Sequence, residues 1–209
     1  MSDSAKVVVL LPVYKGDNPI FLECAINSLL NQTYSDVSIF IGIDGPVGEN
    51  VITCIDGLSA KSDIRVIQFE ENRGLAAVLN DLLNICSKEK MEYIVRMDAD
   101  DISVNNRIQK QLGFLISHPD VDVVGGRIEE INEQSERNGK SVTHPLTHQE
   151  CFKFFRYRDP LAHPAVMFRK SFFDKAKGYR NEYRKNQDTM LWFDGFMNGC
   201  IFANLDETV

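Results

Sequence analysis

Three carboxylates fall within four positions of this sequence, in the segment Asp98-Ala99-Asp100-Asp101, directly after an apolar run. Carboxylates this close repel one another unless a positive charge neutralises them. A hard divalent cation supplies that charge and prefers oxygen ligands, commonly one or two carboxylates together with substrate phosphates. Two acids separated by one residue can also point to the same side of an extended segment. The segment therefore predicts a Mg²⁺ or Mn²⁺ site for a phosphorylated substrate.

A purely structural role is the alternative interpretation of these acids. Asp101 could cap the N-terminus of the next helix while Asp98 and Asp100 are solvated in a turn. An isolated Asp-x-Asp is a weak signal, because exposed acids are common in turns. A position at the carboxyl end of a buried strand favours the metal site, since ligands of open α/β sheets bind there.

The first hundred residues or so alternate between short apolar runs and segments with helical spacing of apolar residues. The continuous run Val7–Val13 is typical of a strand buried on both faces. Asn18-Pro19 is typical of a helix start. Strands are expected at 7–13, 37–43, 64–69 and 93–97, separated by helices that begin near residues 18, 51 and 75. This order predicts an α/β fold with right-handed crossovers and a mostly parallel sheet, in which Asp98 follows the fourth strand.

The second half of the chain has a less regular pattern. Thr147 and Glu150 form a capping box that begins a helix. Glu133–Lys140 is a polar loop and the best candidate for a mobile segment. The other elements expected here are a helix at 107–116, a short strand at 121–124, a strand at 165–168 and a helical face at 191–197 that ends at Gly199. We find no linker that would separate two domains.

Composition limits the class of protein. The chain has 209 residues, 44% of them hydrophobic and 25% charged, which are ordinary globular values. Its net charge of -7 argues against a nucleic-acid partner, whose binding protein would carry a basic excess. The five cysteines are widely spread without Cys-x-x-Cys, which is typical of reduced thiols in a cytosolic protein. Residues 1–6 lack a signal-peptide pattern, and no run approaches the ~20 apolar residues of a membrane span.

Other α/β sites are disfavoured by the residues directly after the first strand. Tyr14-Lys15-Gly16 stands where a phosphoacceptor receiver domain has its acidic pair. The G-x-G-x-x-G of a dinucleotide site and the P-loop pattern are both missing from the sequence. A nucleotidyltransferase would need a glycine-rich, basic loop here, and 14–17 contains one lysine and one glycine.

Six segments together resemble family 2 glycosyltransferases of the GT-A fold, of the bacterial polysaccharide and O-antigen type. They are VLLPVY at 9–14, SLLNQTY at 28–34, ENRGLA at 71–76, RMDADDI at 96–102, DVVGG at 122–126 and AHPAVMFR at 162–169. The resemblance implies one Rossmann-like nucleotide-diphospho-sugar transferase domain over 1–209, with a nucleotide-binding half at 1–102 and an acceptor and catalytic half at 103–209. Relatives continue into further helices, so a C-terminal truncation is expected.

The resemblance also implies the reaction and its participants. The donor is a nucleotide-diphosphate sugar, a UDP-sugar by family frequency, and the cofactor is Mn²⁺ or Mg²⁺. The sugar moves with inversion to a saccharide or lipid-linked acceptor in surface polysaccharide biosynthesis. The expected location is the cytoplasm, with peripheral contact to the inner face of the cell membrane through the missing C-terminal region.

Individual residues take their expected roles from matching positions in the family. Donor-nucleotide binding falls to Pro12, Val13, Tyr14, Asp44, Arg73, Asp98 and Ala99. Asp100 is the expected metal ligand, and His163 is a second candidate beside the metal or the donor phosphate. Asp188 is the expected catalytic base, although an N-cap role in the following helix is the structural alternative.

Two departures from the family keep a catalytically impaired sugar-nucleotide-binding domain open as an alternative. Relatives often carry two or more acids after the second strand, where this chain has Asp44-Gly45-Pro46. Relatives also often place an acid directly before the base, where this chain has Gln187.

Overall fold

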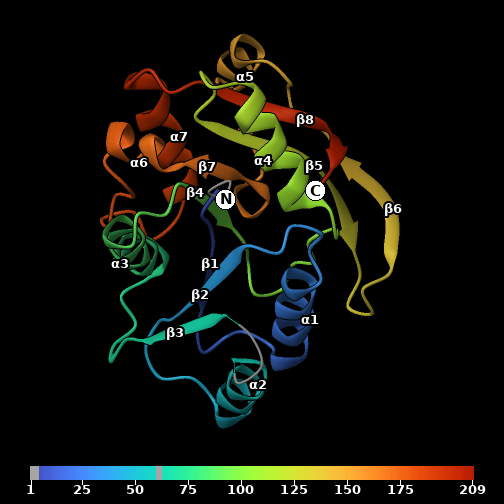
Figure 1. Ribbon diagram of the computed structural model, residues 1–209, viewed down its shortest axis with the longest axis vertical. Coiled ribbons are helices and arrows are strands. Elements are labelled where there is room, and N and C mark those ends of the chain that lie inside the picture. Colours follow the sequence, from blue (N-terminus) through green and yellow to red (C-terminus); the bar gives the residue numbers. More distant parts are fainter. Residues whose placement is uncertain (1–4, 60–62) are drawn as a thin grey trace.

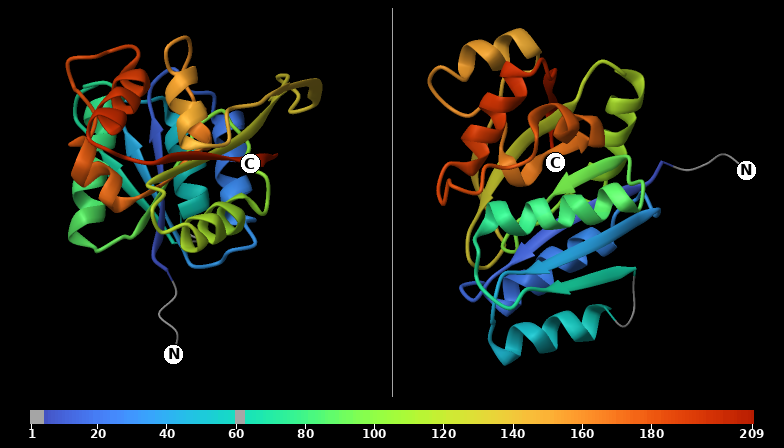
Figure 2. Two further views of the ribbon diagram at one scale, coloured as in Figure 1. Left: turned by 90° about the horizontal axis from the view of Figure 1, so that it is seen from above. Right: turned by 90° about the vertical axis from the view of Figure 1, so that its left-hand side faces the viewer.

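The computed structural model describes residues 5–59 and 63–209. Residues 1–4, part of the N-terminal segment that lacks a signal-peptide pattern, lie outside the described residues. One sheet with the strand order β3-β2-β1-β4-β7-β5-β6 runs through the molecule, and β8 pairs with β5 beside this path. Helices cover both faces of the sheet (Figures 1 and 2). The fold is therefore α/β, as predicted.

The first half of the chain builds the parallel part of the sheet. Its elements are β1 (Val7–Val13), α1 (Pro19–Leu30), β2 (Val37–Ile43), α2 (Glu49–Ser59), β3 (Ile64–Gln68), α3 (Leu75–Lys88) and β4 (Tyr93–Arg96). β1 lies between β2 and β4 and is parallel to both. The Asn18 side chain accepts a hydrogen bond from the Ile20 N–H at 2.9 Å, which confirms the predicted N-cap before Pro19.

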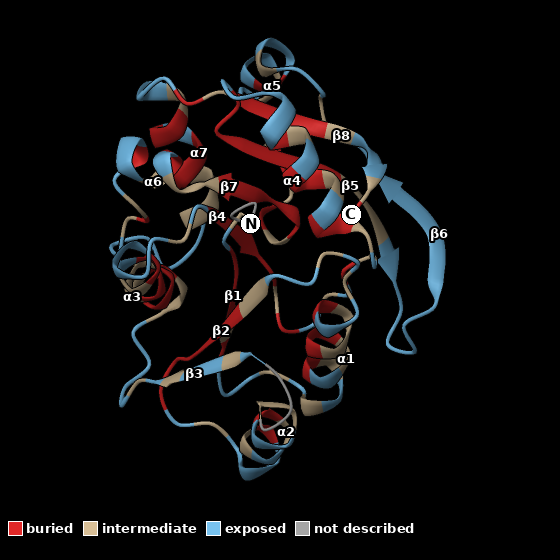
Figure 3. Cartoon of the chain, in the orientation of Figure 1, coloured by how far each residue is buried: buried red, intermediate tan, exposed pale blue. Residues whose placement is uncertain are grey.

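The central position of β1 explains its uninterrupted apolar sequence. Val7, Val9 and Leu11 belong to a core that α1, α2 and α4 share, on one face of the sheet. Val8 and Leu10 belong to a second core with α3, α6 and α7, on the other face. Because side chains alternate between faces along a strand, a strand covered on both sides must be apolar at every position. Figure 3 shows this buried centre of the sheet.

The second half adds antiparallel strands and four helices. Its elements are α4 (Arg107–Ser117), β5 (Val123–Ile131), β6 (Arg137–Val142), α5 (His148–Phe154), a short 3₁₀ helix η1 (His163–Ala165), β7 (Met167–Arg169), α6 (Lys170–Ala176), α7 (Gln187–Met197) and β8 (Phe202–Thr208). β7 runs antiparallel to both β4 and β5 and joins the two halves into one sheet. The predicted capping box of Thr147 and Glu150 is present at the start of α5.

Several boundaries in this half differ from the predictions. The short strand expected at 121–124 is β5, which continues through both glycines to Ile131. The polar loop expected at 133–140 lies partly in β6, which forms a hairpin with β5. The residues of β6 are all exposed, so no alternation of apolar and polar side chains marks this strand. The short element α6 and the strand β8 were not predicted.

The remaining sequence expectations concern cysteines and membrane spans. All five cysteines are free thiols, three of them buried and two half-buried. Within residues 5–59 and 63–209, no helix combines the length and the apolar content that crossing a bilayer would require.

Candidate donor and catalytic site

A cavity of about 460 Å³ lies at the carboxyl ends of β1, β2 and β4. Among its lining residues are all the predicted donor-binding residues except Arg73, together with Asp100. They meet because parallel strands end at the same edge of the sheet, so the segments that follow β1, β2 and β4 become neighbours. Val13 is buried, whereas Tyr14 is 49% exposed and also lines the cavity.

The three acids after β4 converge in space as well as in sequence. Carboxylate oxygens of Asp98, Asp100 and Asp101 all lie within 4.8 Å of one another. α4 begins only at Arg107, with Asn106 in the cap position, so Asp101 does not cap this helix. Three hard oxygen donors at this spacing fit a divalent cation such as Mn²⁺ or Mg²⁺.

Burial and mutual repulsion outweigh the positive charges of Arg96 and Arg107 at this cluster. Burial, reinforced by Asp98 and Asp100, raises the pKa of the Asp101 carboxyl to about 6. Burial likewise raises the pKa of Asp17 to about 6, and the charges of Asp100 and Asp98 add to the shift. The buried Arg96 forms an ion pair with Asp98, but it does not keep the pKa of these neighbouring acids low. A bound cation would relieve the repulsion that remains.

Asp44 holds the backbone of the loop before α3. It is 5% exposed, and its two carboxylate oxygens accept hydrogen bonds from the Arg73 N–H at 2.7 Å and the Gly74 N–H at 2.9 Å. Gly74 has a φ of +92°, a conformation that side chains other than glycine rarely adopt. The carboxylate therefore shapes the wall of the cavity through this loop.

The Arg73 side chain is directed away from the cavity. Its guanidinium forms an ion pair with Asp81 of α3 and lies 4.7 Å from the centre of the Phe69 ring. Arg184 lines the cavity instead, close to Gly74. Sequence reasoning missed Arg184, because the segment between α6 and α7 has no periodic pattern and matches none of the quoted family segments.

Asp188 lies in the first turn of α7, where Asn186 rather than Asp188 occupies the cap position. One carboxylate oxygen, Oδ1, accepts a hydrogen bond from the Thr189 N–H at 2.8 Å. The Thr189 hydroxyl in turn donates to Oδ2 of Asp159 at 2.9 Å. Asp159 is a second acid that sequence reasoning missed. A lone aspartate in a loop gave no signal that it would meet a helix 30 residues further on.

The charges of acids from both halves of the site act on one buried tyrosine, Tyr179. The pKa of Tyr179 is raised by burial, and the charges of Asp188 and Asp98 add to the shift while Arg96 opposes it. Its hydroxyl is therefore close enough to α7 and to the end of β4 for the charges of both to affect it. Trp192 is fully buried in the same core.

His163 is buried against Tyr179 rather than placed among the acids. Its side chain is buried, and its Nε2 lies 2.8 Å from the Tyr179 hydroxyl. Burial, with the nearby Arg96 charge, places the pKa of His163 well below its ordinary value. The neutral imidazole therefore packs with Tyr179 and Trp192 instead of joining the carboxylates.

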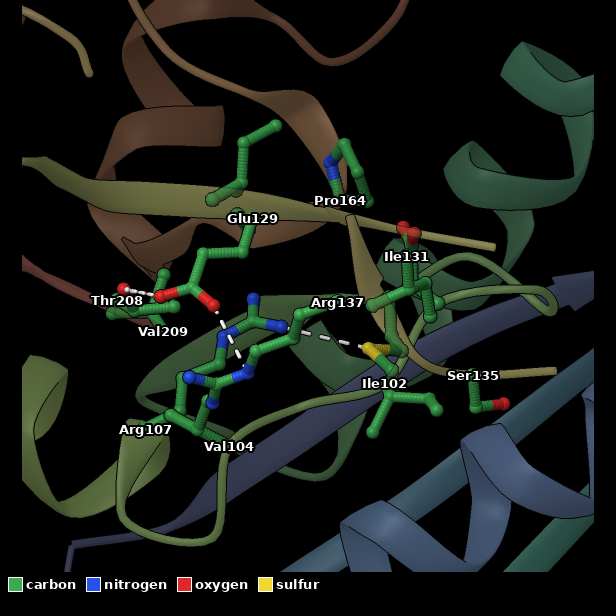
Figure 4. Close-up of a pocket in the computed structure, with 14 residues that line it drawn as sticks. Ile102, Val104, Arg107, Glu129, Ile131, Ser135, Arg137, Pro164, Thr208 and Val209 are labelled. Carbon is green, nitrogen blue, oxygen red and sulfur yellow. Dashed lines mark hydrogen bonds and ion pairs between the residues drawn. The ribbon is translucent and has the colours of Figure 1, made fainter. Parts of the chain in front are cut away.

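A second cavity of about 200 Å³ adjoins the acids on the side of the β5–β6 hairpin. Arg107 and Arg137 both line it, and Glu129 accepts from both Arg137 and Thr208 (Figure 4). Asp101 and Ile102 also line it, so the acidic loop has a cavity on each side.

Comparison with protein families gives one match that covers most of the chain. Residues 8–176 match the family described as glycosyl transferase family 2. A UDP-Gal:alpha-D-GlcNAc-diphosphoundecaprenol beta-1,3-galactosyltransferase from Escherichia coli is 31% identical over 207 residues, which cover 99% of this chain and 74% of the relative. The amylovoran biosynthesis glycosyltransferase AmsE from Erwinia amylovora is 30% identical over 96% of this chain and 73% of the relative.

Solved structures share the fold at lower sequence identity. S. aureus TarS 1-349 in complex with UDP-GlcNAc has a TM-score of 0.76 at 16% identity. The mannosyltransferase PcManGT from Pyrobaculum calidifontis, in complex with GDP-Man and Mn²⁺, has a TM-score of 0.73 at 13% identity. The matches cover 98% and 100% of this chain, which spans 57% and 56% of those two chains.

Proposed function

The chain belongs to glycosyl transferase family 2, and from this premise we propose that it is a metal-dependent, inverting glycosyltransferase of surface polysaccharide biosynthesis. It would transfer a sugar from a nucleotide-diphosphate donor, with UDP as the expected nucleotide, to a saccharide or lipid-linked acceptor. The observation that carries the proposal is the cluster Asp98, Asp100 and Asp101, which lies at the same edge of the sheet as the predicted nucleotide residues.

The nucleotide would lie in the cavity at the ends of β1 and β2. Tyr14 offers an exposed aromatic face for the base, and Pro12 and Val13 form the adjoining wall. Asp44 would act through the loop that it holds rather than through a free carboxylate, because both of its oxygens accept backbone hydrogen bonds. Arg184 is the cationic side chain available to a donor phosphate.

Asp100 would hold Mn²⁺ or Mg²⁺, with Asp98 and Asp101 as the neighbouring carboxylates. When bound, such a cation supplies the positive charge that stabilises a departing nucleoside diphosphate. The buried Arg96 holds Asp98 in place by an ion pair. We do not include His163 among the metal ligands, because its Nε2 is paired with Tyr179.

Asp188 would accept the proton of the acceptor hydroxyl as its oxygen attacks the anomeric carbon. A carboxylate can do this because the hydroxyl becomes acidic only as the new bond forms, and the base needs to be positioned rather than strong. The anomeric bond to the diphosphate breaks on the opposite face, and the leaving group keeps the electron pair. One such displacement, with an oxocarbenium-like transition state, inverts the anomeric configuration.

The relatives support the choice of substrates. The E. coli relative is named for UDP-Gal and for a diphosphoundecaprenol acceptor, and the two solved structures contain UDP-GlcNAc and GDP-Man with Mn²⁺. A lipid-linked acceptor would place the reaction at the cytoplasmic face of the membrane.

A panel of UDP- and GDP-sugars, each with Mn²⁺, Mg²⁺ or a chelator, tests the proposal by thermal shift and by transfer to a lipid-linked saccharide. We expect metal-dependent binding of a nucleotide sugar and product formation. Binding without turnover would favour the impaired binding domain, for which Gln187 beside Asp188 is the specific observation. Binding that ignores the metal would contradict the role of Asp100.

A further inference from the structure

Thr189 connects two acids that are far apart in the sequence. Its N–H donates to Oδ1 of Asp188 at 2.8 Å, and its hydroxyl donates to Oδ2 of Asp159 at 2.9 Å. Asp159 lies in the segment between α5 and η1, whereas Asp188 and Thr189 lie in the first turn of α7. The proposed base and a second carboxylate therefore share one residue as their common anchor.

The other oxygen of Asp159, Oδ1, is buried and has no hydrogen-bond partner among the residues that the structure describes. Within that same part of the chain, neither Asp159 nor Asp188 forms an ion pair. Burial raises the pKa of Asp159, and the charge of Asp188 adds to the shift. Gln187, which precedes Asp188, is neutral, so the nearby carboxylate charge comes from the other segment.

We propose that Asp159 is a positioning residue for the transfer reaction, which rests on the proposed role of Asp188 as the base. Through Thr189, Asp159 fixes the first turn of α7 and with it the direction of Asp188. The proton of the acceptor hydroxyl moves to Asp188, and Asp159 exchanges no atom with the substrate.

The substitution Asp159→Ala tests this anchor, because it removes the oxygen that accepts the hydrogen bond of the Thr189 hydroxyl. We expect kcat to fall about tenfold, with the donor KM unchanged, because Asp188 is then less well oriented. Asp159→Asn is the conservative variant, and its amide oxygen should restore most of kcat by accepting the same hydrogen bond.

Thr189→Val breaks the same link from the other side, because it removes the hydroxyl that donates to Asp159. It should lower kcat to a similar extent, with no further loss when it is combined with Asp159→Ala. Wild-type kcat in Asp159→Ala would overturn the proposal. If Asp188→Asn instead remains active, the assignment of the base fails, which is a different result. Melting temperatures identify any variant that loses its fold.

A separate observation concerns the surface at the end of α5. Phe152, Lys153, Arg156, Tyr157 and Arg158 are all exposed there, Tyr157 by 84% and Phe152 by 48%, and we call them the α5 patch. Its three cations form no ion pair among residues 5–59 and 63–209, although the chain as a whole carries a net charge of -7. Unpaired cations beside exposed aromatic rings are therefore concentrated on a surface of an acidic protein.

The α5 patch borders the proposed acceptor side of the site. Phe152 and Phe155 pack against Phe196 of α7, with ring centres 5.4 and 5.3 Å apart, so α5 and α7 lie together at one end of the molecule (Figure 1). Arg158 directly precedes Asp159. A surface bound at this patch would lie alongside α7, with Arg158 next to the residue that bonds to its first turn.

We infer that the α5 patch docks on an anionic membrane surface. Lys and Arg near such a surface are attracted to its lipid headgroups, and aromatic rings settle at the boundary between headgroups and acyl chains. Membrane docking is independent of the proposed function. Only the further step, that a lipid-linked acceptor reaches the site from this membrane, rests on it. The location differs from the route of membrane contact expected from the sequence, which was a C-terminal region.

Co-sedimentation with vesicles tests the docking. The full chain should bind vesicles of phosphatidylglycerol and phosphatidylcholine, and bind less to phosphatidylcholine alone and at high salt. The double substitution Arg156→Glu and Arg158→Glu should lower the partition coefficient at least tenfold. Lys6→Glu with Lys88→Glu is the matched control, because both cations are exposed and lie elsewhere, one directly before β1 and one at the end of α3.

Equal binding by both double variants, or none by the wild type, would overturn the docking. Binding that requires an added protein and no lipid would also overturn it, in favour of a protein partner. Transfer to a soluble acceptor should be the same in all the proteins compared, so a failure of docking is distinguishable from a failure of the glycosyltransferase assignment.

Discussion

The donor half and the acceptor half of the site are assembled in different ways. On the donor side, Tyr14, Asp44 and Asp98 each follow a strand, and parallel pairing of β2, β1 and β4 brings them together. On the acceptor side, Asp159 comes from a loop and Asp188 from a helix start, and hydrogen bonds to Thr189 bring them together. Backbone geometry therefore positions one half, whereas packing positions the other.

The largest loss of activity should come from a substitution on the acceptor side of the site. Asp188→Asn removes the proposed base but changes no residue of the donor cavity, so transfer should fall about 10²–10⁴-fold while nucleotide-sugar binding is retained. Single-turnover transfer and donor titration measure the two quantities. Transfer at a wild-type rate would mean that another group accepts the proton.

On the donor side, Asp100→Ala should act on binding instead. Removing this carboxylate from the cluster of three should weaken Mn²⁺-dependent donor binding about 100-fold, a loss of roughly 3 kcal/mol. Calorimetric titration of the donor with and without Mn²⁺ measures this. Equal donor affinity in variant and wild type would exclude Asp100 as a metal ligand.

Asp44 should contribute mainly to stability. Asp44→Ala leaves the N–H groups of Arg73 and Gly74 without their buried acceptor, so the free energy of unfolding should fall by about 2–3 kcal/mol. Urea unfolding measures the change. If stability is unchanged and only donor affinity falls, Asp44 binds the base directly.

Replacing Asp101 should change the free energy of unfolding less than Asp44→Ala does, and in the opposite direction. Its pKa is raised from 3.8 to about 6 in the folded protein, so the carboxyl favours folding below pH 3.8 and this contribution is lost as pH rises through 6. Without metal, Asp101→Asn should stabilise the protein at pH 7 by about 1 kcal/mol, with no gain near pH 4. Chemical unfolding in a chelator at both pH values measures this, and a stabilisation that persists at pH 4 would contradict the titration.

Replacing Arg73 should change stability and donor affinity less than any other substitution proposed here. Its ion pair with Asp81 is exposed, so Arg73→Ala should change the free energy of unfolding by less than about 0.5 kcal/mol and leave donor affinity unchanged. Arg184→Ala is the comparison, and it should weaken donor binding. A large loss of donor affinity in Arg73→Ala would restore the role that the sequence predicted.

Much of the fold was predictable where helices cover one or both faces of a strand, because such a strand needs a regular pattern of apolar residues. The bounds of β1 and β2 match the predicted strands, because their apolar runs are covered by helices on both faces. The β5–β6 hairpin and β8 escaped prediction since exposed strands need no apolar pattern and pairing partners far along the chain leave no local signal. Family membership is likewise confirmed, because the matching segments occur in order along the chain.

The sequence alone determined the α/β class, the family and the position of three acids after a buried strand, because these depend on local pattern and chain order. Tertiary structure decided how the acids are used. It turned Arg73 outward to Asp81, brought Arg184 into the donor cavity, and joined Asp159 to Asp188 through Thr189. The physical reason is that a side chain's direction and its charge neighbours depend on packing between distant segments, which residue type and spacing do not specify.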